Sequence, residues 1–132
     1  MKKHLSLLFF VAILAGCAST KQFHQYPDIE SYGSNTAFIH FIRGNSAFGS
    51  AIAAPVYVDG HQIGRIGPGG HLATNVPAKS ITISSTDSSV LLKAETGNVY
   101  YFEISMPTQM WLATPGFDVF QTNERRANKL GF

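Results

Sequence analysis

A single cysteine is the residue of this sequence best suited to covalent chemistry. Cys17 is the only thiol among 132 residues, so a disulfide within the chain is excluded. It follows two basic residues, Lys2 and Lys3, and an apolar run, Leu5–Ala15, that only Ser6 interrupts. The run is too short to span a bilayer, which takes roughly 20 apolar residues. A basic patch, a short apolar core and small residues are typical of an export signal.

The segment Leu14-Ala15-Gly16-Cys17, with the leader in front of it, resembles a bacterial lipobox. The resemblance implies that residues 1–16 are a lipoprotein signal peptide, cleaved before Cys17. It also implies a diacylglyceryl group on the Cys17 sulfur and an acyl group, such as palmitate, on the new amine. Because each buried methylene contributes about 0.8 kcal/mol, two or three such chains anchor a protein for practical purposes permanently. Ala18 stands where lipoproteins retained at the inner membrane tend to carry Asp, which favours the outer membrane, facing the periplasm.

Histidines are the next candidates, because histidine is the commonest metal ligand near neutral pH. Four of them follow the leader: His24, His40, His61 and His71. His61 follows a hairpin turn and His71 follows a glycine-rich turn, so these two could approach each other if their strands pair. The chain has no HxH or HExxH spacing, which favours surface histidines over a metal site. His40 sits in an apolar stretch, which predicts a half-buried ring with a hydrogen bond.

The sequence carries no recognised catalytic spacing. It has no G-x-S-x-G elbow, and lipidation would leave no thiol for nucleophilic work. Asp59 and Glu95 lie at predicted turns, whereas paired-carboxylate catalysis needs two acids across a cleft. Gly67–Gly70 precedes a strand pattern and not the helix that a phosphate loop requires. We therefore expect no catalytic residues, no cofactor and no enzyme.

The balance of charge argues against a nucleic-acid partner. Loss of Lys2 and Lys3 with the leader leaves eight basic and eight acidic residues, so the mature chain is nearly neutral. No basic stripe is interleaved with aromatic residues. Arg43, at a predicted strand end, and the Arg125-Arg126 pair are interpreted as solvated charges.

Short strands separated by turns are expected to position these residues. Their segments are rich in β-branched and aromatic residues or alternate apolar with polar residues. They cover 36–43, 55–66 as a hairpin, 71–76, 80–86, 89–95, 99–105 and 117–122. Asp59-Gly60 marks the hairpin turn, since glycine accepts positive φ. Asn123 is a candidate N-cap for a short C-terminal helix.

The predicted fold is all-β: a small antiparallel β-sandwich of about seven to eight strands, preceded by the cleaved signal helix. The expected domain covers residues 36–132. Residues 17–35 are expected to hold the lipidated cysteine and a polar tether. Within the tether, Phe23, Tyr26, Ile29 and Tyr32 are spaced three apart, so docking on the domain as a helical turn or lid is an alternative.

A family resemblance covers most of residues 36–105. It is carried by AFIHFIRGNSAFGSAIAAPVYVDGHQIGRIGPGGHLATNVPAKSITIS and by ETGNVYYFEI. Its pattern is a first strand ending in Arg, a VYVDG…IG hairpin, a G…V-P turn and a strand rich in Thr and Ile. The chain resembles an uncharacterised-domain family of bacterial lipoproteins, domain of unknown function number 2846. The resemblance implies a fold and a location in the cell envelope, with no established activity to carry over.

These observations predict a lipid-anchored envelope lipoprotein whose sandwich acts as a non-catalytic structural or protein-interaction module. Its expected partners are the membrane, through Cys17, and an envelope protein. Phe48 and Trp111 are the candidate contacts, because aromatic residues are enriched in binding hot spots, although Trp111 also fits the core. The alternative is a small-ligand or metal-binding module that uses His61 and His71. A weak hydrolase is the least favoured hypothesis.

Overall fold

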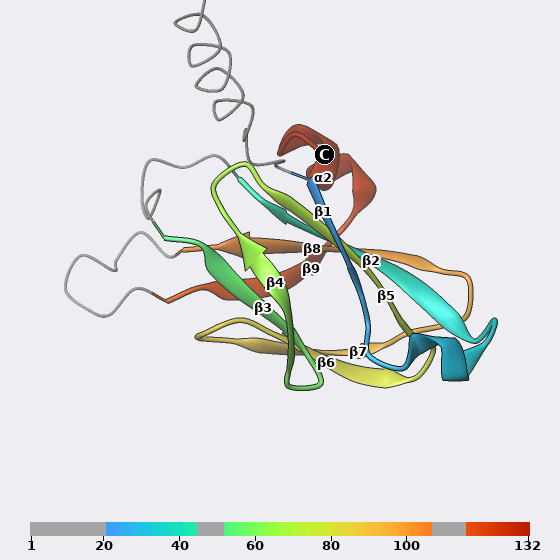
Figure 1. The fold of residues 1–132 in the computed structure, drawn as a ribbon. Helices are drawn as coiled ribbons and strands as arrows, with labels where there is room; N and C mark the ends of the chain where they lie inside the picture. The colour runs from blue at the N-terminus through green and yellow to red at the C-terminus, as the bar shows by residue number, and fades with distance from the viewer. Residues whose placement is uncertain (1–20, 45–51, 107–115) are drawn as a thin grey trace, which may run out of the picture.

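The computed structural model describes residues 21–44, 52–106 and 116–132, which form a two-layer β-sandwich (Figure 1). The five-stranded sheet has the order β1-β5-β2-β8-β9 and the four-stranded sheet the order β4-β3-β6-β7. The elements are β1 (Lys21–Gln25), η2 (Ile29–Tyr32), β2 (Thr36–Arg43), β3 (Ala54–Val58), β4 (His61–Ile66), β5 (His71–Pro77), β6 (Ser80–Ser84), β7 (Ser89–Lys93), β8 (Val99–Ser105), β9 (Asp118–Thr122) and α2 (Glu124–Lys129).

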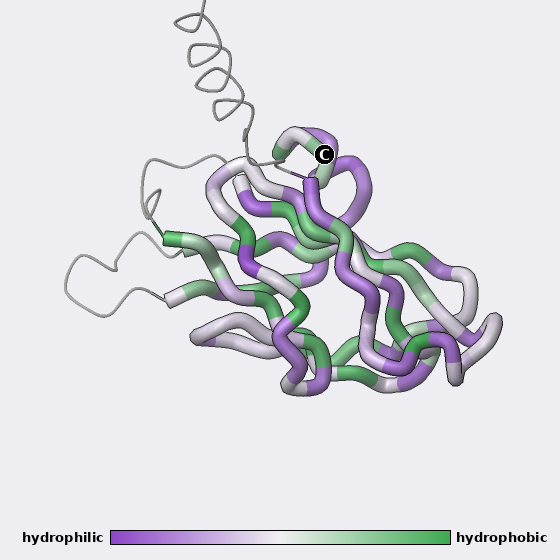
Figure 2. Tube along the Cα trace, in the orientation of Figure 1, coloured by the Kyte–Doolittle hydropathy of each residue, from purple (hydrophilic) through white to green (hydrophobic). Residues whose placement is uncertain are grey.

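The core lies between the two sheets and follows the alternation of the strands. Ile39 and Phe41 of β2 are fully buried, as are Val56 and Val58 of β3 on the facing sheet. Apolar positions, drawn in green, recur along the strands of both layers in Figure 2. Burial of every second residue is what period-two patterning predicts for a half-buried strand, so the predicted β-sandwich is confirmed.

The β3–β4 hairpin forms at the predicted turn. Asp59 and Gly60 have φ values of 47° and 79°, which is the left-handed region that such two-residue turns require. The Asp59 side chain also accepts a hydrogen bond of 2.8 Å from the backbone N–H of Thr82 on β6. The turn residue therefore ties the hairpin to the neighbouring strand.

The N-terminal segment differs from the predicted tether, because residues 21–35 belong to the sandwich. β1 pairs with β5 from Lys21↔His71 to Gln25↔Asn75 and becomes a ninth strand. Tyr26 and Ile29 are buried in the core, with 6% and 5% of their surfaces exposed. The segment therefore docks on the domain, but as a strand followed by a short 3-10 helix and not as the single helical turn or lid of the alternative, and Phe23 stays 60% exposed. β1 itself gave no strand signal because it pairs through its backbone while four of its five side chains stay exposed.

Two strand pairs are parallel, in an otherwise antiparallel sandwich. β1 runs parallel to β5, and β2 runs parallel to β8. One row of paired residues consequently crosses the five-stranded sheet near one end, from Lys21 through His71, Ile42 and Glu103 to Phe120. We call this end of the sheet, where β1 begins and β2 and β8 finish, the anchor end.

Both open sides of the sandwich are closed by hydrogen bonds between the layers. The Gln22 amide of β1 donates to the Arg65 carbonyl of β4, at 3.0 Å. On the other side, the backbone N–H of Val119 in β9 donates to the Ser88 hydroxyl beside β7, at 2.8 Å. Such contacts occupy backbone groups that an exposed strand edge would otherwise offer to another chain. Within the described ranges, no helix is long and apolar enough to cross a membrane.

Candidate functional site

The anchor end is where the two segments holding the predicted partner contacts leave the sheet. β2 and β8 are parallel neighbours, and Arg43 at the end of β2 pairs with Ile104 near the end of β8. The chain segments that follow these strands therefore depart from the same end (Figure 1). Phe48 and Trp111 belong to these two segments and lie outside the described residues, as do Cys17 and the rest of the lipobox, Leu14, Ala15 and Gly16.

Arg43 holds the bases of both segments together. Its guanidinium donates hydrogen bonds from Nη1 to the carbonyl oxygens of Ile52, at 2.6 Å, and Ile66, at 2.9 Å. The guanidinium carbon lies 4.7 Å from the ring centre of Phe117. Ile52 follows the first segment and Phe117 follows the second. One side chain thus fixes where the first segment starts and where both segments end.

Arg43 is buried, with 3% of its surface exposed, which overturns the interpretation of this residue as a solvated charge. Burial lowers the pKa of Arg43, yet a guanidinium keeps its proton in proteins. Its hydrogen bonds and the Phe117 ring compensate the lost hydration. The sequence held one sign of this burial, because Arg43 ends a strand that has apolar residues on both faces. The same pattern also fits an arginine at a solvated strand end, so it did not decide between the two.

A histidine pair lies on the outer face of the five-stranded sheet. His40 Nδ1 and His71 Nε2 are 2.8 Å apart, which is a hydrogen bond with one ring as donor and the other as acceptor. The ring of Phe132 packs edge-on against both, at centroid distances of 4.7 Å and 5.0 Å, and Tyr101 stacks on His40 at 5.3 Å. The predicted half-buried His40 with a hydrogen bond is confirmed. Its partner was missed because His71 comes from the neighbouring strand.

Both histidines are held in the neutral form. Burial lowers the pKa of His40 to about 4, and the neighbouring His71 adds to the shift. Burial also lowers the pKa of His71, with a further contribution from the Lys21 charge. His71 Nδ1 is buried and has no hydrogen-bond partner among the described residues. The pair is therefore a desolvated, uncharged contact at neutral pH.

His61 does not join this pair. It lies exposed on β4, in the four-stranded sheet, where its ring packs edge-on against Tyr26 at 5.8 Å. β4 and β5 belong to different sheets, so the strand pairing that would bring His61 to His71 does not occur. Among the residues that the structure describes, no group of three or more His, Cys, Asp or Glu side chains could hold a metal ion.

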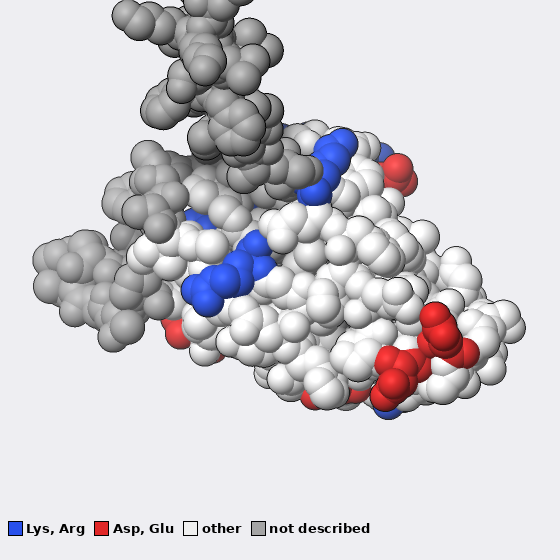
Figure 3. Space-filling model, in the orientation of Figure 1, with Lys and Arg blue, Asp and Glu red and all other residues white. Residues whose placement is uncertain are grey.

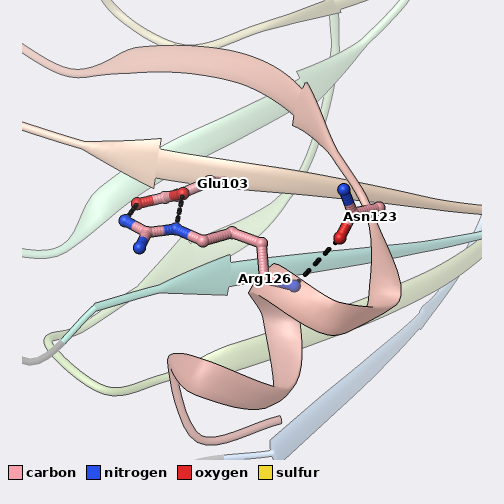
Figure 4. Close-up of polar contacts among 3 residues, drawn as sticks. All are labelled: Glu103, Asn123 and Arg126. Carbon is pink, nitrogen blue, oxygen red and sulfur yellow. Dashed lines mark hydrogen bonds and ion pairs between the residues drawn. The ribbon is translucent and has the colours of Figure 1, made fainter.

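The C-terminal helix is pinned over the same face of the sheet (Figure 4). The buried carboxylate of Glu103 on β8 accepts two hydrogen bonds from Arg126. The donors are Nε, at 3.0 Å, and Nη2, at 3.1 Å. These contacts raise the pKa of Arg126. Its side chain is 52% exposed, so Arg126 is a solvated charge, as interpreted, that also forms an ion pair. Asn123 caps the helix by accepting from the Arg126 backbone N–H, so the predicted short helix and its cap are confirmed. The ion pair between Glu103 and Arg126 holds α2 against the sheet. The chain end that follows α2 packs the Phe132 ring against His40 and His71.

A hollow at the opposite end of the sheet is small. It encloses about 190 Å³ and is lined by Thr36, Ala37, Phe38, Asn75, Gly97 and Asn98. Pockets for small ligands typically enclose about 300–1,000 Å³. The hollow is therefore a weak candidate for a ligand site.

Comparison with known proteins places the sandwich in a family. The family model described as "Protein of unknown function (DUF2846)" matches residues 33–116. The chain belongs to this family. No curated protein matches it significantly. Among solved structures, it is similar to the N-terminal domain of AlgF from P. aeruginosa, with a TM-score of 0.42 and 20% identity, over 67% of this chain and 95% of that chain.

Replacing Arg43 tests its role at the segment bases. Arg43→Met keeps much of the side-chain volume but leaves the Ile52 and Ile66 carbonyls without this donor, so we expect the free energy of unfolding to fall by about 2–4 kcal/mol. Urea denaturation followed by circular dichroism measures the change. Arg125→Met, on the exposed face of α2, is the matched control and should change stability by less than about 0.5 kcal/mol. Equal effects of the two variants would contradict the assignment.

Acid should destabilise the fold through the histidine pair. The unfolded chain binds a proton at His40 near its ordinary pKa of 6.5, whereas the folded chain binds it only near 4. This contribution to stability is therefore complete above about pH 6.5 and is lost as the pH falls towards 4. We expect a loss of roughly 1–2 kcal/mol after allowance for solvent screening of a part-exposed ring.

Urea denaturation at several pH values between 7 and 4 measures this loss. His40→Phe should flatten the pH dependence, while His61→Gln, which removes an exposed histidine, should leave it unchanged. An unaltered pH dependence in His40→Phe would show that the pair is not its source.

Proposed function

We propose that this protein is a lipid-anchored module of the bacterial cell envelope that works by binding, without catalysis, and recruits a protein partner at the membrane surface. The observation that carries the proposal is the row of paired residues at the anchor end. It begins at Lys21, four positions after Cys17, and passes through Ile42 and Glu103, next to the ends of β2 and β8. The predicted lipid and both partner-contact segments thus belong to one end of the domain.

The distance between the lipid and the sandwich supports this arrangement. Four residues span at most about 14 Å when fully extended. The folded domain therefore begins within that distance of the Cys17 acyl chains, in place of hanging from a tether of 19 residues. A partner that contacts the anchor end must itself lie at or in the membrane. We place the protein at the outer membrane, facing the periplasm, on the strength of Ala18.

The packing of Arg43 supports binding through the two segments. Its contacts with Ile52, Ile66 and Phe117 fix the points at which the segments meet the sheet. Fixed ends reduce the conformational entropy that a binding loop loses on association. Phe48 and Trp111 would provide the aromatic contacts that dominate many interfaces.

The alternative of a ligand or metal module has lost its geometric basis. It relied on His61 and His71 approaching each other, and these residues lie in different sheets. His71 instead bonds to His40 under the ring of Phe132. We therefore rank partner binding first.

Photo-crosslinking in the native envelope tests the proposal. A photoreactive amino acid at position 111 should yield a discrete adduct, while the same group at Leu91, exposed on β7, should yield none. The adduct should disappear in Cys17→Ala, which removes the acylated sulfur and leaves the residues of the sandwich unchanged. Absence of an adduct at position 111, or equal adducts at 111 and 91, would contradict the proposal.

A further inference from the structure

One corner of the sandwich combines three exposed cations with an exposed aromatic ring. Lys21 and Phe23 lie on β1, Arg65 on β4 and Lys129 in the last turn of α2, and all four are exposed. We call these four residues the basic corner. Lys21 lies four residues after Cys17. A lipid on Cys17 would therefore bring this corner close to the membrane surface.

The four residues converge at the anchor end although they come from three elements. Gln22, between Lys21 and Phe23, donates from its side chain to the Arg65 carbonyl at 3.0 Å. Leu130, which follows Lys129, lies 3.3 Å from the point where a Cβ would sit on Gly44, just after β2. Lys21 itself starts the row of paired residues at this end.

Phe23 is an unusual residue for a solvent-facing edge strand. It is 60% exposed, although its ring stacks on Phe38 of β2 at a centroid distance of 6.0 Å. Phe is among the apolar residues that surface-bound proteins bury at the boundary between lipid headgroups and acyl chains. An exposed ring two residues into the first strand lies within reach of a bilayer that holds Cys17.

Charge is distributed so as to orient the domain. Figure 3 shows basic side chains near the start of β1 and over β4, whereas acidic side chains gather at the other end of this face, beside η2. Asp28, Glu30 and Asp59 are exposed at that far end, beside η2 and at the β3–β4 turn. An anionic surface attracts each nearby Lys or Arg by about 1 kcal/mol, within a Debye length of roughly 8–10 Å, and repels the acids.

We infer that the basic corner lies against the surface of an anionic lipid bilayer, so that the β1–β4 side of the anchor end faces the membrane. This inference rests on the proposed lipidation of Cys17. It adds an orientation that lipidation alone does not specify. Asp87 and Asp118 lie near the β7–β9 side of the same end and would be turned away from the lipid headgroups.

Fluorescence quenching of the full lipidated protein in vesicles tests this orientation. The vesicles contain phosphatidylethanolamine, phosphatidylglycerol and a nitroxide-labelled lipid. An introduced cysteine at Phe23 or at Leu91 carries the fluorophore, since lipidation consumes the sulfur of Cys17. Leu91 is the matched control, because it is an apolar residue that is 72% exposed on β7, away from the corner. We expect several-fold stronger quenching at position 23 than at position 91.

Charge reversal distinguishes the effect of the basic corner from the effect of the lipid anchor. Combined Lys21→Glu and Arg65→Glu should bring quenching at position 23 down towards the value at position 91. Lys79→Glu with Lys93→Glu, which reverses two exposed charges elsewhere, should leave it unchanged. Equal quenching at positions 23 and 91, or quenching at 23 that survives reversal of the corner, would overturn the inference. Flotation of the protein with the vesicles measures lipid anchoring separately. A protein that does not float would contradict the proposed lipidation and not only the proposed orientation.

Discussion

A buried guanidinium is the constraint on which the anchor end of this sandwich depends. A charged group in an apolar interior costs several kcal/mol unless its hydrogens find acceptors. Arg43 meets that requirement with the carbonyls of Ile52 and Ile66 and with the face of Phe117. Arg43 ends β2 of the five-stranded sheet, whereas Ile66 ends β4 of the four-stranded sheet and Ile52 lies just before β3. Satisfying one charge therefore joins two sheets that no strand pairing connects.

Strand topology turns this local constraint into a functional arrangement. The parallel pairing of β2 with β8 brings two chain segments out at one end, and the parallel pairing of β1 with β5 starts the folded chain at the same end. Under the proposed function, the lipid at Cys17, the two partner-contact segments and the exposed cations would all lie at this end of the domain. We propose that such a nearly neutral module binds its partner at a membrane, where this end of the domain is held in place.

Local composition and alternation were enough to predict seven to eight strands, and turn and capping residues were enough to predict the Asp59-Gly60 turn and the helix cap at Asn123, because each depends on neighbours close in the chain. β1 escaped prediction because its exposed side chains carry no alternation, and it was assigned to the tether. Strand order and the two parallel pairs were not predicted either. A two-residue hydrophobic period specifies which face of the sheet a residue occupies, but not which strand lies beside it. The contact of His40 with His71 and the burial of Arg43 depend on that order, so sequence patterning could identify the residues but not their partners.

The central claim is that lipid on Cys17 holds the anchor end of the sandwich at the membrane. Intact-mass spectrometry of the protein purified from its native envelope tests the claim most directly. The account predicts a chain that begins at Cys17 and carries the added mass of a diacylglyceryl group and an amide-linked acyl chain. A species that retains residues 1–16, or one that begins at Cys17 with an unmodified thiol, would contradict it.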